Sequence, residues 1–353
     1  MFWGFEKLKI DIYGESHSKA IGVKLSGLPI GSEICDKTLN EFLARRKAGG
    51  GIWSTPRIEP DAPVFLEGLE NGKITGDIHS VIYNQNVKSR DYSSINHTPR
   101  PSHADLAYCL KENTTECPVG GGRFSARLTA PLCIAGGVAK QILAKEGIEV
   151  CGYVSRIGSV VGKNYKDDEI SVDEIKKSWS SPLPALSNID EMTSEVLKFR
   201  ENGDSVGGSV DIIVTGLKPG FGDYLFSGLE GKLSYAVFGV PAVKAVEFGI
   251  GTDFAKTNGS KANDSIYFNG EKVVTKTNNC GGITGGISNG MPITMRVSLK
   301  PTPSISCPQQ SVDLSTNENV EIKIKGRHDS CIVPRAVAGI ESAVALALLD
   351  YII

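Results

Sequence analysis

PRAVAGIESAVALALLDY, residues Pro334–Tyr351, constrains the fold more than any other stretch of the chain. Proline stands in its first turn, and Val337, Ile340, Val344 and Leu348 recur at the spacing of one helix face. A long apolar stripe of this kind belongs to a helix that packs against other elements. The stretch therefore predicts a core helix.

A second core helix and three strands are predicted around it. Ala130–Glu146 has helical periodicity and is followed by Gly147, a typical helix terminator. Glu149–Val161, Ser209–Thr215 and Pro292–Leu299 have the alternating or β-branched composition of strands. The core is expected to contain both helices and strands.

Two segments share the form of a strand that ends in a glycine turn. VKLSGLPIG covers Val23–Gly31, and IIVTGLKPG covers Ile212–Gly220. Each leads to a predicted helix, the first with Asp36 as its expected N-cap and the second with apolar residues from Leu229 to Val237. An internal duplication and a chance likeness between two half-buried strands explain this pattern equally well.

No linker divides the chain. The segment Gly162–Ile189 is polar and contains Pro182 and Pro184, so it is predicted to be a surface insertion. Motif-bearing loops occur toward both ends of the sequence without a break in composition. This distribution favours one integrated domain over two modules.

Composition excludes several classes of protein. The 353 residues are 40% hydrophobic, which is enough for a buried core and excludes bulk disorder. Lys+Arg 38 against Asp+Glu 40 gives a net charge of -2, so neither nucleic acid nor an anionic membrane is an expected partner. No apolar run approaches a membrane span of about 18 residues, and the N-terminus carries charges where a signal peptide is apolar. A cytoplasmic location is predicted.

Eight cysteines are spread along the sequence without a CxxC pair. Such spacing is unlike that of a zinc site or a redox motif. They are predicted to be reduced and mostly buried, and no metal is expected.

Glycine is enriched locally. The chain has 40 glycines in 353 residues, above the average share of about 7%. They cluster at Gly120–Gly122, Gly281–Gly282 and Gly285–Gly286, among other places. Glycine clusters suit loops in which a ligand approaches main-chain N–H groups, so loops are expected to form much of the ligand site.

Three of the five histidines lie in polar loops beside charged residues: His17, His103 and His328. An imidazole exchanges protons near neutral pH, and nearby arginines suit an anionic substrate. A single loop histidine is more often a solvated turn residue. Three with the same surroundings favour a site for proton transfer.

The segment GGGRFSARLTA, Gly120–Ala130, opens the predicted helix Ala130–Glu146 and combines free N–H groups with two arginines and two hydroxyls. This composition suits phosphate, although the segment matches neither the P-loop nor GxGxxG. Seven of the twelve arginines lie in or beside such segments, namely Arg45, Arg46, Arg100, Arg123, Arg127, Arg327 and Arg335. The predicted site is basic although the protein is not.

Six motifs together resemble the chorismate synthase family. They read GESHS at Gly14, RPSHAD at Arg100, GGGRFSARLTAP at Gly120, GGITGGISNG at Gly281, KPTPS at Lys300 and GRHDSCIVPR at Gly326. Their order is that of the family, and they extend over nearly the whole chain. Chance is therefore a poor explanation.

Some residues depart from the family pattern. Ser18 and Ser102 replace glycines beside the histidines, and Lys47 replaces the third arginine of a triplet. Because a Cβ restricts φ, the two serines predict either a local backbone with negative φ or a shifted loop. Phe124, Leu128 and Ser330 are further departures.

The resemblance implies the last step of the shikimate pathway. 5-Enolpyruvylshikimate 3-phosphate would lose phosphate and a ring proton in an anti 1,4-elimination that gives chorismate. Reduced FMN is the implied cofactor, without net redox change. NADPH is expected only as a reductant, used either by this enzyme or by a separate flavin reductase.

The resemblance also implies roles for single residues. His17 would protonate the departing phosphate, His103 would keep the reduced flavin in its productive protonation state, and Asp329 would assist proton removal at the flavin. The implied FMN contacts are Arg123, Phe124, Ser125, Pro241, Ala242, Gly285, Lys300, Pro301, Thr302, Pro303, Ser304 and Arg327. The implied substrate contacts are Arg45, Arg100, Arg127 and Arg335, and Lys47 stands at an implied NADPH contact.

The family fold implied by the resemblance is a single α+β domain over residues 1–353. In it, antiparallel sheets enclose central helices as a β-α-β sandwich, and the chain assembles as a homotetramer. Two other functions account for part of the pattern. A phosphate-binding module would explain the glycines and arginines but not the acid–base residues, and a phosphomonoester hydrolase would use a histidine and arginines similarly.

Overall fold

The computed structural model describes residues 2–4, 6–47, 52–53, 59–85, 96–324 and 329–353. Its centre is a pair of helices that pack against each other, α3 (Thr129–Lys145) and α8 (Val333–Ile352). Both predicted core helices are confirmed, with their ends displaced by one residue. All residues of α8 from Val337 to Asp350 are buried, as its nearly uniform apolar sequence requires.

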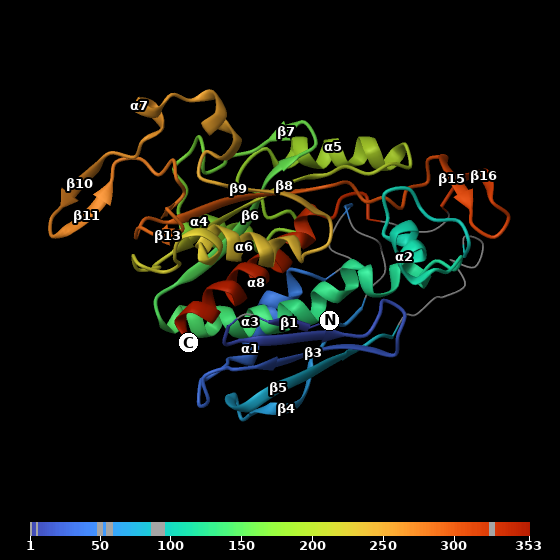
Figure 1. Cartoon of the computed structure of the whole chain (residues 1–353), viewed down its shortest axis with the longest axis horizontal. Coiled ribbons are helices and arrows are strands. Elements are labelled where there is room, and N and C mark those ends of the chain that lie inside the picture. Colours follow the sequence, from blue (N-terminus) through green and yellow to red (C-terminus); the bar gives the residue numbers. More distant parts are fainter. Residues whose placement is uncertain (1, 5, 48–51, 54–58, 86–95, 325–328) are drawn as a thin grey trace.

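Sheet A lies on one side of the helix pair, at the bottom of Figure 1. Its antiparallel strands are, in spatial order, β1 (Phe2–Gly4), β2 (Lys9–Tyr13), β3 (Ala20–Ser26), β5 (Lys73–Tyr83) and β4 (Val64–Glu70). In β3 the alternate residues Ile21, Val23 and Leu25 are fully buried, and the strand packs against α3. The sheet therefore covers α3 with one face.

Sheet B lies on the other side and packs against α8. Its antiparallel strands are β7 (Val160–Val161), β6 (Glu149–Ile157), β8 (Gly208–Thr215), β14 (Ile293–Leu299) and β9 (Val243–Phe248). Figure 1 shows α3 and α8 between the two sheets. The predicted mixture of helices with antiparallel sheets is confirmed.

Shorter elements surround these layers. The helix α1 (Asp36–Ala44) packs on α3, and α6 (Leu229–Phe238) packs on α8. The other helices are α2 (Asp105–Glu112), α4 (Val172–Ser178), α5 (Ile189–Glu201) and α7 (Gly259–Ala262), with 3-10 turns η2 (Val119–Phe124), η3 (Ala126–Leu128), η4 (Leu225–Ser227) and η5 (Gly251–Lys256). Three hairpins pair β10 (Ile266–Asn269) with β11 (Lys272–Thr275), β12 (Ile283–Thr284) with β13 (Ile287–Ser288), and β15 (Gln309–Asp313) with β16 (Glu318–Ile322).

Two predictions about the ends of elements are wrong. The strand predicted over Glu149–Val161 ends at Ile157, because Gly158 with φ +54 turns the chain into β7. Asp36 is the first residue of α1 rather than its N-cap. The extended backbone that an N-cap needs occurs at Cys35, with φ -87 and ψ 114.

The predicted surface insertion is part of the fold. It contains α4, whose Ile175 is fully buried against Tyr153 and Ile213 of sheet B. Leu183 is also fully buried, and Ala185 forms a parallel bridge with Val154. Most residues of this segment are polar, so its sequence gives little sign of the few apolar side chains that cover the outer face of sheet B.

The two similar sequence segments occupy corresponding places. β3 and β8 are each the middle strand of a five-stranded sheet, and each leads to a helix that packs on the central pair. The glycines that end them, Gly27 and Gly216, have φ of +88 and +80. These corresponding positions agree with an internal duplication. A common origin of the two segments stays a hypothesis.

One hydrophobic cluster joins both sheets and the central helices, from Leu8 to Leu349. Five of the eight cysteines are buried, as predicted. Among the residues that the structure describes, no helix combines the length and apolar character needed to cross a membrane. The number of domains stays a prediction.

Candidate active site

The glycine triplet Gly120–Gly122 brings the two predicted catalytic histidines together. Its residues have φ of +60, +90 and +51. A Cβ at Gly120 would lie 2.1 Å from Cε1 of His17, and a Cβ at Gly121 would lie 2.9 Å from Cε1 of His103. Only glycine fits between the two imidazoles with this backbone.

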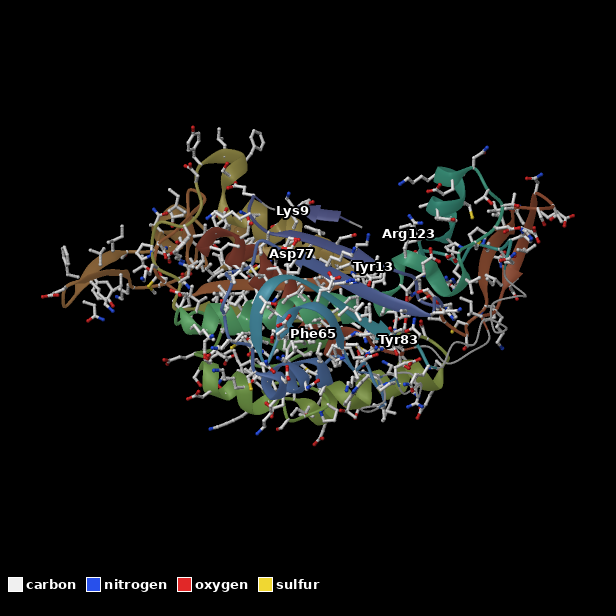
Figure 2. The ribbon with its side chains drawn as sticks, turned by 90° about the horizontal axis from the view of Figure 1, so that it is seen from below. Lys9, Tyr13, Phe65, Asp77, Tyr83 and Arg123 are labelled. Carbon is white, nitrogen blue, oxygen red and sulfur yellow. The ribbon has the colours of Figure 1, made fainter. Side chains whose placement is uncertain are left out.

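The triplet lies beyond one end of sheet A. Figure 2 shows Arg123, the next residue, near the end of the sheet that carries Tyr13 and Tyr83, whereas Lys9 and Asp77 lie toward the opposite end. His17 follows Tyr13 in the turn between β2 and β3. Because β2 runs toward this end of the sheet, the turn that follows it places His17 next to the glycine triplet.

Ser16 connects the His17 loop to the segment that contains the glycine triplet. Ser16 is 3% exposed, and its Oγ lies 2.8 Å from Nδ1 of His17. The Ser16 amide donates to the carbonyl of Gly122 at 3.1 Å, and its hydroxyl lies 3.3 Å from the carbonyl of Val119. Sequence reasoning assigned no role to Ser16, although its place beside His17 was a usable signal.

Charged groups hold the His103 loop. Asp105, in the first turn of α2, is 1% exposed, and its Oδ1 lies 2.6 Å from Nδ1 of His103. Arg100 donates to both carboxylate oxygens, from Nε to Oδ2 at 2.7 Å and from Nη2 to Oδ1 at 3.0 Å. Burial alone would raise the pKa of Asp105, but hydrogen bonds from His103 and Arg100 outweigh burial and lower it. The carboxylate is therefore ionised.

Arg100 also connects the loop to a predicted cofactor segment, through Nη1 to Oγ of Ser304 at 3.1 Å. In the same segment, Lys300 donates from its amide to the carbonyl of Ala242 at 3.0 Å and from Nζ to the carbonyl of Ser102. Burial and the neighbouring Lys244 lower the pKa of Lys300. The structure thus joins residues 300–304 and Ala242, which follows Pro241, to the His103 loop.

A buried arginine pair adjoins the His17 loop. Asp61 accepts from Nη1 of Arg46 at 2.7 Å and from Nη1 of Arg127. Arg127 also donates from Nε to Oδ1 of Asn84 at 3.0 Å, and Asn84 donates to the carbonyl of Ser18 at 2.8 Å. Burial lowers the pKa of Arg46 to about 10. Asp61 and Asn84 therefore fix Arg127, and Asn84 links it to the loop that carries His17.

Asp329 joins the same network. Nη1 of Arg335 donates to Oδ2 of Asp329 at 2.6 Å, and Nε of Arg335 donates to the carbonyl of Arg46 at 3.1 Å. Arg335 is therefore the link between Asp329 and Arg46. Successive side-chain contacts therefore connect Asp329 to the loop that carries His17. The residues between them are Arg335, Arg46, Asp61, Arg127 and Asn84.

Arg45 has a different environment from the other predicted substrate arginines. Its guanidinium donates to Glu341 of α8 at 2.6 Å and 3.0 Å and lies 3.8 Å from the ring of Trp179. Lys140 donates to the same carboxylate. Burial would raise the pKa of Glu341, but Arg45 and Lys140 outweigh it and lower the pKa. The side chain of Arg45 is thus engaged inside the protein, and its substrate role stays a prediction.

Three further predicted cofactor residues follow the glycine triplet. Arg123 has a side chain that is 60% exposed and lies 3.9 Å from Glu15. Phe124 makes an edge contact with Tyr108 at 6.0 Å between ring centroids, and Ser125 accepts from the amide of Arg127 at 3.2 Å. These residues border the two histidine loops.

Gly285 lies elsewhere in the chain. It has φ +63 in the turn between β12 and β13, next to Gly286, which contacts Asp223 and Gly228. Figure 1 shows β13 far from α2, which carries Asp105. Lys47 follows α1 and donates from its amide to Ala44. Arg327 lies outside the described residues, and the roles of all three stay predictions.

Comparison with known proteins identifies the family. The family model described as chorismate synthase matches residues 8–353. The chain belongs to the chorismate synthase family. A protein of Methanocaldococcus jannaschii with this name is 43% identical, covering 99% of this chain and 95% of its own length. One of Thermococcus kodakarensis is 42% identical, covering 98% and 96%.

A solved structure shares the fold. A crystal structure of chorismate synthase superimposes with a TM-score of 0.75 at 26% identity, covering 99% of this chain and 92% of that chain. The family predicted from the six motifs is confirmed, and so is the prediction of an enzyme of the lyase class.

Proposed function

We propose that this chain converts 5-enolpyruvylshikimate 3-phosphate to chorismate by anti 1,4-elimination of phosphate, with reduced FMN as cofactor. The observation that carries the proposal is the meeting of His17 and His103 across the glycine triplet. An elimination of phosphate needs a proton donor for the leaving group and a separate path for the ring proton. Membership of the family supplies the reaction, and the two imidazoles supply the proton-transfer groups.

The polar groups around the triplet fit anionic ligands. Nη2 of Arg127 and Oγ1 of Thr302 are buried, and neither has a hydrogen-bond partner within the described part of the chain. Such orphaned donors are expensive to bury unless a ligand uses them. Arg123 adds an exposed guanidinium beside the same loops. A phosphorylated substrate and a flavin phosphate would satisfy these donors.

Two groups of residues would hold reduced FMN. Arg123, Phe124 and Ser125 follow the triplet in the chain, and Ala242 with residues 300–304 is joined to the His103 loop. The bound cofactor would supply transient electron donation, which would ease departure of the phosphate without net redox change. Glycines with positive φ leave room for close approach to main-chain N–H groups.

His17 is the proposed proton donor to the departing phosphate. Its Nδ1 faces the hydroxyl of Ser16, which can donate or accept, so the imidazole can be held in either protonation state. Arg127, fixed beside this loop, would stabilise the charge that develops on the phosphate. His103 exchanges a proton on the other side of the triplet.

Asp329 is the proposed base that assists removal of the ring proton. Its carboxylate is held by Arg335. Asp329→Asn keeps the shape and removes the basic oxygen. We expect turnover to fall by roughly 10² to 10⁴-fold, while FMN and substrate binding stay near normal. Single-turnover chorismate formation and FMN titration measure the two effects separately. Weaker FMN binding with normal turnover of the loaded enzyme would instead show that Asp329 only fixes the loop through Arg335.

The alternative functions are tested by the product. Under anaerobic conditions with photoreduced FMN, we expect phosphate release together with loss of the C6 hydrogen and the diene absorbance of chorismate. Phosphate release without the diene would identify a phosphomonoester hydrolase, and binding without turnover would identify a phosphate-binding module. Repeating the assay with NADPH alone decides whether a separate flavin reductase is needed. Homotetramer formation and a cytoplasmic location stay predictions.

A further inference from the structure

We propose that Asp105 is a positioning residue that fixes the tautomer of His103, with the proton on Nδ1 and with Nε2 as the atom that exchanges protons. The catalytic part of this proposal rests on the proposed function, whereas the tautomer does not. Four observations carry it: the contact to Nδ1, the ionisation of Asp105, the position of Arg100, and the side of the ring that faces the glycine triplet.

The contact to Nδ1 defines the proton position. Oδ1 of Asp105 lies 2.6 Å from Nδ1 of His103, and an ionised carboxylate can only accept hydrogen bonds. Nδ1 of a neutral imidazole must then carry the proton. Arg100 Nη2 also lies 3.1 Å from Nδ1, but it donates to Asp105 Oδ1 at 3.0 Å. Both donors therefore converge on one carboxylate oxygen.

Asp105 is held rigidly enough to enforce this choice. Besides the two bonds from the Arg100 side chain, its Oδ2 accepts from the Arg100 amide at 3.2 Å. The carboxylate is buried, so each of its bonds is made in a medium of low polarity, where leaving a donor unpaired is costly. Asp105 has little freedom to turn away from His103.

The other edge of the imidazole faces the glycine triplet. A Cβ built on Gly121 would lie 3.1 Å from Nε2 of His103, so this nitrogen borders the space that glycine leaves open. Within the part of the chain that the structure describes, no hydrogen bond to Nε2 is formed. With the proton on Nδ1, Nε2 keeps its lone pair at the border of this space and can accept a proton there.

Arg100 makes Asp105→Asn a decisive variant. An asparagine has one acceptor oxygen. Two donors of Arg100, Nε and the amide, need this oxygen at the Oδ2 position, whereas only Nη2 needs it at the Oδ1 position, so the Oδ2 position is favoured. The asparagine NH₂ group would then face Nδ1 of His103 and donate to it. The proton of the imidazole would move to Nε2, as a carboxylate-to-amide exchange does in the serine protease triad.

The chain contains a matched control. Asp211 is fully buried and accepts from Nε and Nη2 of Arg296 at 2.8 Å each, and among the described residues no histidine is hydrogen-bonded to it. It also accepts from Oγ of Ser155 at 2.7 Å. Asp211→Asn therefore removes the same charge from a buried aspartate–arginine pair, away from His103.

The experiment is ¹⁵N NMR of the full chain with labelled histidine, well above the ordinary imidazole pKa of about 6.5. The five histidines give few signals, and His103→Gln identifies those of His103. We expect Nδ1 to be protonated in the wild type and in Asp211→Asn, and Nε2 to be protonated in Asp105→Asn. Steady-state kinetics should show kcat lowered by roughly 10²-fold or more in Asp105→Asn, with KM changed less than about threefold.

The wild-type spectrum alone can overturn the proposal, if Nε2 carries the proton. An unchanged tautomer in Asp105→Asn would overturn it as well. If Asp105→Asn does not fold, Asp105→Glu keeps the carboxylate and should keep Nδ1 protonated. The spectra need no substrate or flavin, so an enzyme that forms no chorismate would refute the proposed function without deciding the tautomer.

Discussion

The two histidine loops hold the same kind of side chain by opposite means. Nδ1 of His103 contacts an ionised, buried aspartate that an arginine holds in place, whereas Nδ1 of His17 contacts the hydroxyl of Ser16. A carboxylate imposes one tautomer, because it accepts only. A hydroxyl imposes none, because it can donate or accept.

This difference suits two different tasks. A group that gives its proton to a departing phosphate must gain it again, so a partner that tolerates both states is useful at His17. A group that exchanges its proton at one defined nitrogen benefits from a partner that fixes the proton on the other nitrogen, as proposed for His103. The glycine triplet lets both loops approach the same space although their supports differ.

The largest expected effect is on turnover. His17→Ala and His103→Ala should each lower kcat by roughly 10²-fold or more, because each removes a positioned proton-transfer group. Single-turnover assays with reduced FMN measure this loss, and substrate titration should show little change in binding. Full turnover in either variant would show that the histidine it lacks has only a structural role.

The free energy of unfolding should be more sensitive to the loss of Asp105 than to the loss of Ser16. Asp105→Ala leaves the buried guanidinium of Arg100 without its carboxylate, and we expect a loss of about 3–5 kcal/mol in the free energy of unfolding. Ser16→Ala removes one neutral hydrogen-bonding group and should cost about 1 kcal/mol. Urea unfolding at one protein concentration measures both. Equal losses would show that the charge of Asp105 adds nothing to its support of the loop.

The free energy of unfolding should depend on acid pH through Asp105 but not through Ser16. Hydrogen bonds from His103 and Arg100 outweigh burial and place the pKa of Asp105 below its unfolded value of about 3.9. A carboxylate with a lowered folded pKa adds stability above that unfolded value, and the contribution is lost as the pH falls below about 4. Asp105→Asn should therefore lose less stability than the wild type over this acid range, and Ser16→Ala should follow the wild type. Urea unfolding at several pH values tests this, and parallel curves for all three proteins would contradict it.

The smallest effects concern the serines beside the histidines, for which the sequence predicts similar behaviour. Ser102 has φ +58, so the predicted negative φ is wrong there, and glycine would relieve strain. Ser18 lacks a positive φ, and its hydroxyl donates to the carbonyls of Ala20 and Glu15 at 2.6 and 2.9 Å. Ser102→Gly should leave stability unchanged or raise it by up to about 1 kcal/mol, and Ser18→Gly should lower it by about 1 kcal/mol. Thermal unfolding that ranks the two variants in the reverse order would show that the loops are supported differently from this account.

The sequence by itself determined the family and the two central helices, and it predicted the histidines and arginines that lie around the glycine triplet. Their signals are local: helical periodicity in Pro334–Tyr351, and motifs whose residues are adjacent in the chain. The roles of Asp105, Ser16 and Asp61 depended on which atoms meet across the fold, and only the tertiary structure decided them. The same holds for Arg45, whose partner Glu341 lies in the last helix, 296 residues away. Hydrogen bonds and ion pairs between distant segments leave no periodicity in the sequence, because packing alone brings their atoms within reach.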